Sequence, residues 1–202
     1  GSLKSLEAAD LIEKGIRRVY SAAQIEKIAI ADGGEGTVEA MVASLQGEYR
    51  YAEVSDPIGN KVRARYGIVN GDTAIIEMAE ASGLYLVAKE YRNPLTTSTY
   101  GTGELIRDAL SRGCRKIILG IGGSATNDGG MGMAAALGVK FLDQDREPLE
   151  MGGGFLDRLQ RIDISSVIPL VGETEFVVAC DVNNPLCGER GASRVFGPQK
   201  GA

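Results

Sequence analysis

Residues 116–130 read KIILGIGGSATNDGG, an apolar run that leads into a glycine-rich turn. The β-branched run Lys116–Ile121 predicts a buried strand, and the small apolar residues after it predict a helix over Asp128–Leu137. A strand, a glycine-rich turn and a helix, in that order, are the building unit of α/β proteins. The stretch therefore predicts an α/β fold in which the turn lies at the carboxyl end of a strand.

Strand and helix patterns continue on both sides of that stretch. Helices are predicted over Ser5–Tyr20, Gly36–Leu45, Thr102–Arg112 and Leu156–Ile162. Strands are predicted over Ile25–Ala31, Tyr49–Val54, Lys61–Val69, Ala74–Met78, Val139–Leu142 and Glu175–Cys180. Asn-Gly between two alternating runs predicts a hairpin, and polar residues 144–154 predict an exposed loop. The prediction is a mixed β-sheet with flanking helices.

Length and composition exclude several classes of protein. The chain has 202 residues, 44% of them hydrophobic and 24% charged, which is ordinary for a globular protein with a sizeable core. A net charge of −5 argues against general nucleic-acid binding, and no apolar run approaches the ~18 residues that span a bilayer. Three cysteines without a CxxC pair suit a reducing cytoplasm. Because histidine is absent, the chemistry has to use carboxylates, lysine, hydroxyls, backbone amides or a hard metal ion.

Three glycine-rich segments lie where a strand meets a helix or where a helix begins. They are residues 31–37 (ADGGEGT), 97–103 (TSTYGTG) and 120–130 (GIGGSATNDGG). Glycines let backbone N–H groups approach a phosphate, and the first turn of a helix adds partial positive charge. The alternative is an ordinary tight turn with a helix cap, which is weakest for the third segment because capping does not need that density of glycine. Neither a Walker A loop nor the dinucleotide fingerprint Gly-x-Gly-x-x-Gly occurs, which argues against a Rossmann dehydrogenase.

Acidic residues follow the predicted strands or lie in the loops after them, namely Asp32, Glu35, Asp128 and Asp181. In open α/β sheets, ligands bind at the carboxyl ends of strands. Carboxylates at that edge can hold Mg²⁺ or accept a proton from an attacking hydroxyl, whereas the alternative for each acid is a helix cap. Near the end of the chain, Lys200 in residues 196–201 (FGPQKG) is either a solvated side chain or a cation that neutralises a phosphoryl group.

Five motifs together resemble the bacterial glycerate kinase family, which includes 2-phosphoglycerate-forming enzymes. They are residues 31–37 (ADGGEGT), 98–106 (STYGTGELI), 122–130 (GGSATNDGG), 181–186 (DVNNPL) and 197–201 (GPQKG), in the family's order. The resemblance implies two α/β domains with a cleft between them, one of them flavodoxin-like. That domain is expected to be incomplete, because the chain lacks the family's first strand and C-terminal part. We assign residues 1–55 to the flavodoxin-like domain and residues 56–202 to a second α/β domain with the hairpin and the glycine-rich loops.

The resemblance also implies a reaction, in which the γ-phosphoryl group of ATP is transferred to a hydroxyl of D-glycerate with Mg²⁺. Two alternatives stay open from the residues: a kinase of another small hydroxy acid or sugar, and a metabolite-binding module without catalysis. The expected partners are ATP and D-glycerate, without nucleic acid or membrane, in the cytoplasm. A homodimer stays open.

The candidate site residues fall into three sets. The candidates for proton transfer and charge neutralisation are Asp32, Asp128, Asp181 and Lys200. The candidate metal ligands are Asp32, Glu35 and Asp181, and the sequence does not decide which acid is a base and which is a ligand. The candidates for binding substrate or phosphate are Gly122, Gly123, Ser124, Thr126, Asn127, Thr97, Ser98 and Thr99.

Overall fold

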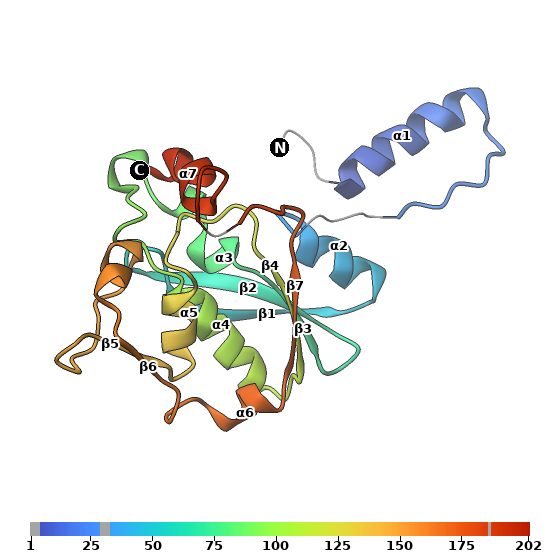
Figure 1. Cartoon of the computed structure of the whole chain (residues 1–202). Coiled ribbons are helices and arrows are strands. Elements are labelled where there is room, and N and C mark those ends of the chain that lie inside the picture. The colour runs from blue at the N-terminus through green and yellow to red at the C-terminus, as the bar shows by residue number, and fades with distance from the viewer. Residues whose placement is uncertain (1–4, 29–32, 186) are drawn as a thin grey trace.

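A five-stranded mixed sheet forms the centre of the computed structural model, which describes residues 5–28, 33–185 and 187–202. The strand order is β1-β2-β3-β4-β7, as Figure 1 shows. Strands β1 (Glu48–Ser55), β2 (Lys61–Val69) and β3 (Thr73–Glu77) are antiparallel neighbours, whereas β4 (Lys116–Gly120) and β7 (Glu175–Ala179) run parallel to β3. The predicted α/β fold with a mixed sheet and flanking helices is confirmed.

The hairpin between β2 and β3 forms where the Asn-Gly pair predicted it. Val69 pairs with Thr73, and both Asn70 and Gly71 have positive φ, at 53° and 84°. Asparagine and glycine adopt this left-handed backbone at the least cost, so the pair fixes the register of the two strands. The hairpin between β1 and β2 crosses the predicted domain boundary at residue 55, and the two strands pair from Glu48 to Ser55. That boundary stays a prediction.

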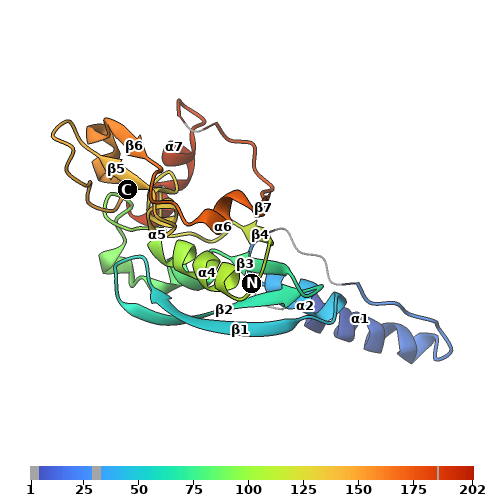
Figure 2. The same cartoon turned by 90° about the horizontal axis from the view of Figure 1, so that it is seen from below.

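Helices cover both faces of the sheet because its strands alternate in period two. Helix α4 (Tyr100–Ser111) packs on one face, where Tyr66, Ile76 and Ile117 are fully buried. Helix α2 (Thr37–Ser44) packs on the other face against Val69 and Ile75. Figure 2 shows α4 lying along β1 and β2. The predicted core helices and strands are therefore in place, with ends shifted by a few residues.

Shorter elements surround this core. They are α3 (Ala79–Ser82), α5 (Met131–Ala136), α6 (Pro169–Gly172), α7 (Ala192–Phe196), the 3₁₀ turns Leu84–Leu86, Lys89–Tyr91, Gly153–Arg158 and Pro198–Lys200, and the two-stranded sheet of β5 (Lys140–Leu142) and β6 (Arg161–Asp163). The helix predicted over Leu156–Ile162 is wrong in its second half, because residues 161–163 pair with β5. The predicted loop 144–154 is exposed at its polar tip, but Leu149 is buried and a 3₁₀ turn begins at Gly153.

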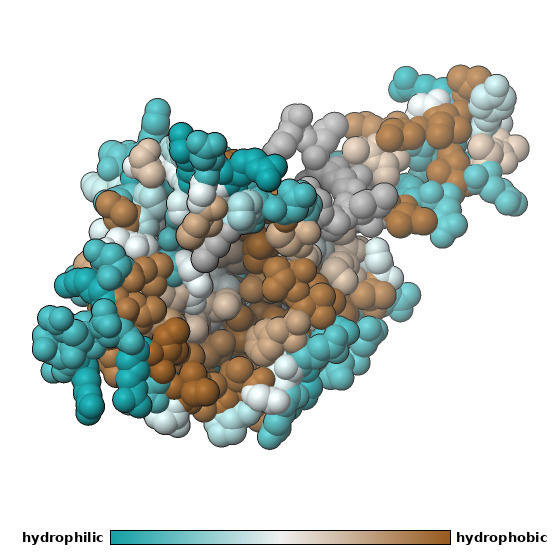
Figure 3. Space-filling model, in the orientation of Figure 1, coloured by the Kyte–Doolittle hydropathy of each residue, from teal (hydrophilic) through white to brown (hydrophobic). Residues whose placement is uncertain are grey.

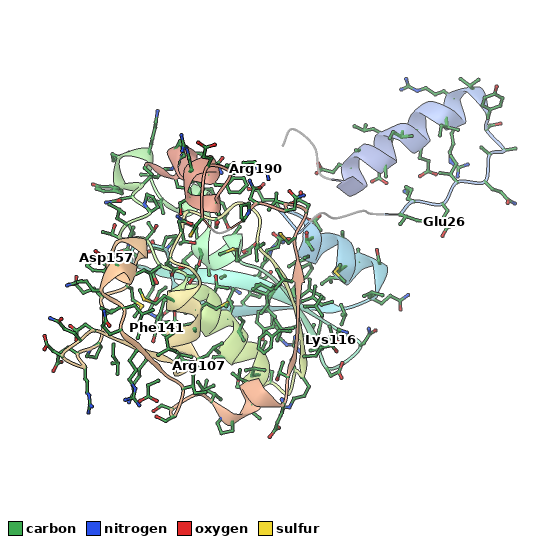
Figure 4. The ribbon with its side chains drawn as sticks, viewed as in Figure 1. Glu26, Arg107, Lys116, Phe141, Asp157 and Arg190 are labelled. Atoms are coloured by element: carbon green, nitrogen blue, oxygen red, sulfur yellow. The ribbon has the colours of Figure 1, made fainter. Side chains whose placement is uncertain are left out.

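The strand predicted over Ile25–Ala31 is not found in residues 25–28, and residues 29–31 lie outside the described part. Helix α1 (Ser5–Val19) and the segment after it are set apart from the sheet, with Glu26 labelled there in Figure 4. No described strand pairs with residues 25–28, and Ile28 is 69% exposed. An apolar run needs a neighbouring strand to satisfy its backbone groups, and these residues have none among the described ranges.

Strand β7 is the exposed apolar edge of the sheet. It pairs with β4 on one side, and Phe176, Val177 and Val178 are 41%, 38% and 54% exposed. The hydrophobic surface in the middle of Figure 3 lies over this strand. Within the described residues, no helix is long and apolar enough to cross a membrane.

Candidate active site

The candidate site lies where the three parallel strands end. Glu77, Gly120 and Ala179 are register partners at the carboxyl ends of β3, β4 and β7, so the loops after these strands leave the same edge. In Figure 4, Lys116 marks the opposite, amino end of β4, and Arg190 lies beyond the carboxyl ends. This edge is where ligands bind in open α/β sheets, which agrees with the position predicted for the glycine-rich turn.

Glycines from two of the predicted segments lie in direct contact. The N–H of Gly122 donates to the Gly33 carbonyl at 3.2 Å. A Cβ on Gly120 would lie 2.4 Å from the Gly33 carbonyl oxygen, and one on Gly122 would lie 2.9 Å from the Gly34 Cα. Gly33 has φ of +88°, and a Cβ on it would lie 2.6 Å from the Ala179 carbonyl oxygen at the end of β7. Glycine is needed here because the two backbones approach too closely for any side chain.

Substituting Gly122 tests this close approach. In Gly122→Ala, the new methyl group has to displace the backbone of Gly34, and overpacking of this kind costs about 1–3 kcal/mol of unfolding free energy. We expect substrate affinity to fall with it, because the two loops separate. Gly172→Ala is the matched control, since nothing lies within 4 Å of the added Cβ. Urea unfolding and calorimetric titration check both effects, and wild-type values for Gly122→Ala would contradict the contact.

Glu77 is a buried acid at this edge that sequence reasoning missed. Its side chain is 4% exposed, and Oε1 accepts the Val38 backbone N–H at 2.7 Å, so the carboxylate caps the first turn of α2. Burial raises the pKa of Glu77, and the hydrogen bond from Val38 opposes that shift. An acid at the end of the apolar run TAIIE was the available signal, of the same kind that singled out Asp32 and Asp181. Glu77 thereby fixes α2 and the Gly33–Gly36 loop before it.

The raised pKa of Glu77 predicts a pH-dependent stability. The folded protein keeps the Glu77 proton above 4.5, the ordinary pKa at which the unfolded chain loses it. The stabilisation is therefore complete below pH 4.5 and is lost as the pH rises through the raised pKa. We expect the unfolding free energy of wild type to fall relative to Glu77→Gln across that window, in urea titrations at successive pH values. A difference that is independent of pH would contradict the burial of a titrating carboxyl.

Asp128 joins the second and third glycine-rich segments. Its side chain is 1% exposed, and Oδ2 accepts hydrogen bonds from the Thr99 N–H and hydroxyl at 2.9 and 2.8 Å and from the Gly132 N–H at 3.1 Å. Oδ1 accepts the Gly130 N–H at 3.0 Å. The helix was predicted to begin at Asp128 but begins at Met131, because the Asp128 carboxylate accepts the N–H groups of Gly130 and Gly132 as a cap does at the start of a helix. With four donors, the carboxylate is built to hold the loops together.

The hydroxyl residues predicted to bind substrate are buried in the same junction. Thr97 donates from Oγ1 to the Ala125 carbonyl at 2.9 Å. The Ser98 hydroxyl accepts the Tyr100 N–H at 3.1 Å, and the backbone N–H of Ser98 donates to the Pro57 carbonyl. The Thr99 hydroxyl accepts the Met133 N–H at 2.9 Å. All three residues are less than 9% exposed, so their hydroxyls bond within the protein beneath the glycine-rich turn.

Lys200 reaches into the third glycine-rich segment. Its ammonium donates to the Ser124 hydroxyl and to the Thr126 carbonyl, both at 2.7 Å, and the residue is 8% exposed. No carboxylate lies within 4.0 Å of it in the part of the chain that the structure describes. Burial lowers the pKa of Lys200, and the charge of Asp128 opposes that shift. The alternative of a solvated lysine is therefore wrong, and the cation lies at the glycine-rich turn.

Other predicted residues are not drawn into this cluster. Glu35 and Asp181 are exposed, and the Asn127 side chain donates to the Ser193 hydroxyl at 2.7 Å. Asp32 lies outside the described residues. Gly123 has φ of +71°, and its carbonyl accepts the Leu84 N–H. Across residues 5–28, 33–185 and 187–202, no three acid or thiol side chains lie together as a metal-binding group.

A cavity of about 550 Å³ lies away from the carboxyl ends of the parallel strands, beside the hairpin at Asn70 and Gly71. Its two arginines already have acidic partners, Arg50 with Glu48 and Arg112 with Asp108. It is lined by Gln46, Gly47, Glu48, Arg50, Ile68, Asn70, Gly71 and Arg112. Because none of the predicted site residues lines it, the candidate site is the glycine-rich edge.

Comparison with known proteins decides between the families that use such an edge. The model of the glycerate kinase family matches residues 1–202. The chain belongs to the glycerate kinase family. This confirms the family that the five motifs indicated.

Similar proteins match this chain over its whole length. It is 58% identical to the glycerate kinase of Halalkalibacterium halodurans and 55% identical to the glycerate 2-kinase of Escherichia coli, in each case over 100% of the chain and 53% of the relative. The crystal structure of a candidate glycerate kinase 2 from Salmonella typhimurium LT2 is 51% identical, with a TM-score of 0.90, over 100% of this chain and 54% of that one. The chain thus spans about half the length of the curated relatives it matches.

Proposed function

We propose that the protein containing this chain is a glycerate kinase that transfers the γ-phosphoryl group of ATP to a hydroxyl of D-glycerate. The observation that carries the proposal is the buried ammonium of Lys200, held at a glycine-rich turn by Ser124 and Thr126. A cation beside closely packed backbone N–H groups suits the charge of a transferring phosphoryl group. Membership of the glycerate kinase family supports the choice of substrate.

The proposed reaction is an in-line displacement at the γ-phosphorus of ATP. A lone pair of the glycerate hydroxyl forms a bond to the γ-phosphorus, and the bond from that phosphorus to the bridging oxygen breaks, so that ADP leaves with the electron pair. The hydroxyl proton passes to a carboxylate, for which exposed Asp181 at the end of β7 is the candidate we favour. The name of the Escherichia coli relative, glycerate 2-kinase, supports the 2-hydroxyl as the acceptor.

We assign different roles to the buried and to the exposed residues of the site. Asp128 and Thr97 to Thr99 are bound by the protein itself, so we assign them to positioning the turn. The N–H groups of Gly122 and Ala125 donate within the chain, so the other N–H groups of residues 123–127 and the Lys200 ammonium are assigned to the phosphate or to the glycerate carboxylate. Asp181, Glu35 and Asp32 remain for proton transfer and metal binding. Free cysteines in the described chain support a reaction in the cytoplasm.

Magnesium fits this division of residues. Mg²⁺ usually binds through one or two carboxylates together with substrate phosphates and water, rather than in a cage of protein ligands. Exposed Glu35 and Asp181 are of that type, and the described residues supply no cage of three. The ion would offset the negative charge of the nucleotide.

Metal removal gives a direct prediction. In excess EDTA, phosphoryl transfer should stop, and added Mg²⁺ or Mn²⁺ should restore it, since a site of oxygen ligands selects hard cations. The rate of ADP release is the measurement. Full activity in excess chelator would contradict a role for a divalent ion.

The substrate is tested by a panel of acceptors with the intact protein. ADP release is followed with ATP and Mg²⁺ and with D-glycerate, other small hydroxy acids or sugars. We expect turnover with D-glycerate well above the others. Turnover of a sugar but not of glycerate would favour the alternative kinase, and nucleotide binding without any transfer would favour the binding module.

A further inference from the structure

The C-terminal segment of the chain lies along the glycine-rich turn. Lys200 donates to the Ser124 hydroxyl and to the Thr126 carbonyl of the turn, both at 2.7 Å. Earlier in the same segment, within α7, the Ser193 hydroxyl accepts a hydrogen bond from Nδ2 of Asn127, also at 2.7 Å. Figures 1 and 2 show α7 beside the loop that leads from β4 to α5. Ser193 is therefore fixed to the same turn as Lys200.

The Ser193 hydroxyl keeps a proton for a further partner. A serine hydroxyl has one O–H donor and two acceptor positions, and the Asn127 amide occupies one of the acceptor positions. Within the described ranges, no acceptor receives a hydrogen bond from the Ser193 hydroxyl. Ser193 is exposed, so its O–H is open to a group that approaches the turn.

This property separates Ser193 from the hydroxyls beneath the turn. Thr97 donates its hydroxyl proton to the Ala125 carbonyl at 2.9 Å, and Thr99 donates its own to the Asp128 carboxylate at 2.8 Å. Both threonines are buried, so neither hydroxyl is open to a ligand. The sequence indicated these buried hydroxyls as substrate ligands and did not indicate Ser193.

The Asn127 amide gives the Ser193 hydroxyl a direction. The Ser193 oxygen faces Nδ2 of Asn127 with a lone pair, so its proton points away from Asn127. The chain at Asn127 is itself held in place, because the next residue, Asp128, accepts four hydrogen bonds from the protein. Accepting a hydrogen bond also strengthens a hydroxyl as a donor. The turn thus holds an oriented donor on its exposed side.

We propose that Ser193 is a binding residue for a substrate oxyanion at the glycine-rich turn, and that Asn127 positions it. A hydroxyl with only its proton to offer fits an oxyanion, which only accepts. The oxyanion is a phosphate of the nucleotide or the carboxylate of the hydroxy acid. This choice of ligands rests on the proposed function, whereas the donor rests on the contact between Asn127 and Ser193.

Calorimetric titration of the intact protein tests this donor. Wild type, Ser193→Ala and Ser111→Ala are each titrated with D-glycerate and with adenylyl imidodiphosphate, a nonhydrolysable ATP analogue. Ser111 is the matched control, because its exposed hydroxyl also makes a hydrogen bond, to the Asp108 carbonyl, but at the last residue of α4. We expect Ser193→Ala to weaken one ligand by about tenfold, since a hydrogen bond to a charged group is lost. Ser111→Ala should change both affinities by less than about twofold.

Two further variants separate a donor from a serine that only supports the structure. Ser193→Thr keeps the hydroxyl and should regain most of the affinity that Ser193→Ala loses. Asn127→Ala should weaken the same ligand by about threefold or more, but by less than about twofold when Ser193 is already alanine, because Asn127 acts through Ser193. A loss in Ser193→Thr as large as that in Ser193→Ala, or losses that multiply in the double variant, would overturn the proposal.

The two ligands separate the sources of the oxyanion. A loss for D-glycerate alone assigns Ser193 to the carboxylate, and a loss for the nucleotide analogue alone assigns it to a phosphate. Affinities of Ser193→Ala within about twofold of wild type for both ligands would overturn the binding role. A wild type that binds ligand but transfers no phosphoryl group, while Ser193→Ala loses affinity, would overturn the proposed function and support the binding role of Ser193.

Discussion

Lys200→Gln in the intact protein is expected to lower kcat for glycerate phosphorylation by about 10²–10³-fold, the loss typical of removing a positioned donor from a developing negative charge. The glutamine amide can still donate to Ser124 or Thr126, but it carries no charge. Lys116→Gln is the control, because Lys116 lies at the opposite edge and pairs with Glu175 at 3.0 Å. We expect that variant to keep its activity.

The pH dependence of kcat gives the same test a second readout. Because burial lowers the pKa of Lys200, the cation is lost at a pH below its ordinary value of 10.5. Activity should therefore fall as the pH rises through the lowered pKa, and this limb should be absent from Lys200→Gln. An identical alkaline limb in both proteins, or a normal kcat in the variant, would remove Lys200 from the reaction.

Asp181→Asn is expected to reduce the rate by about 10²-fold or more, because the change removes the charge that proton transfer or metal binding needs. Asp181 is exposed and follows β7, so the isosteric amide should leave the thermal unfolding midpoint nearly unchanged. Asp145→Asn, in the exposed loop between β5 and β6, is the matched control. A folded Asp181→Asn protein with normal turnover would exclude the residue from the site.

The fold was predictable where the pattern is local. The hairpin followed from Asn70-Gly71, and the buried strand β4 followed from its β-branched run, because both signals act within a few residues. The predictions of a strand at residues 25–28 and of a helix at residues 159–162 were wrong. Whether a short apolar run becomes a strand depends on a partner strand elsewhere in the sequence. Tertiary pairing overrides local propensity at such places.

The candidate site could likewise be predicted only in part. The glycine-rich turn was visible because its density of glycine has no ordinary structural reason, and Lys200 was found through its motif. The burial of Lys200 could not be predicted, since hydrogen bonds to residues 76 and 74 positions earlier in the chain create it. The positioning role of Asp128 likewise follows from four donors that only the folded chain brings together.

Phosphorus NMR of the reaction mixture tests the central proposal, that the Lys200 turn transfers a phosphoryl group to glycerate. The intact wild-type protein and Lys200→Gln are each incubated with ATP, Mg²⁺ and D-glycerate. In the wild-type sample we expect the γ-phosphate resonance of ATP to be replaced by a phosphoglycerate resonance as ADP forms, and in the Lys200→Gln sample we expect ATP to persist. Release of inorganic phosphate without phosphoglycerate, or equal product from both proteins, would contradict the proposal.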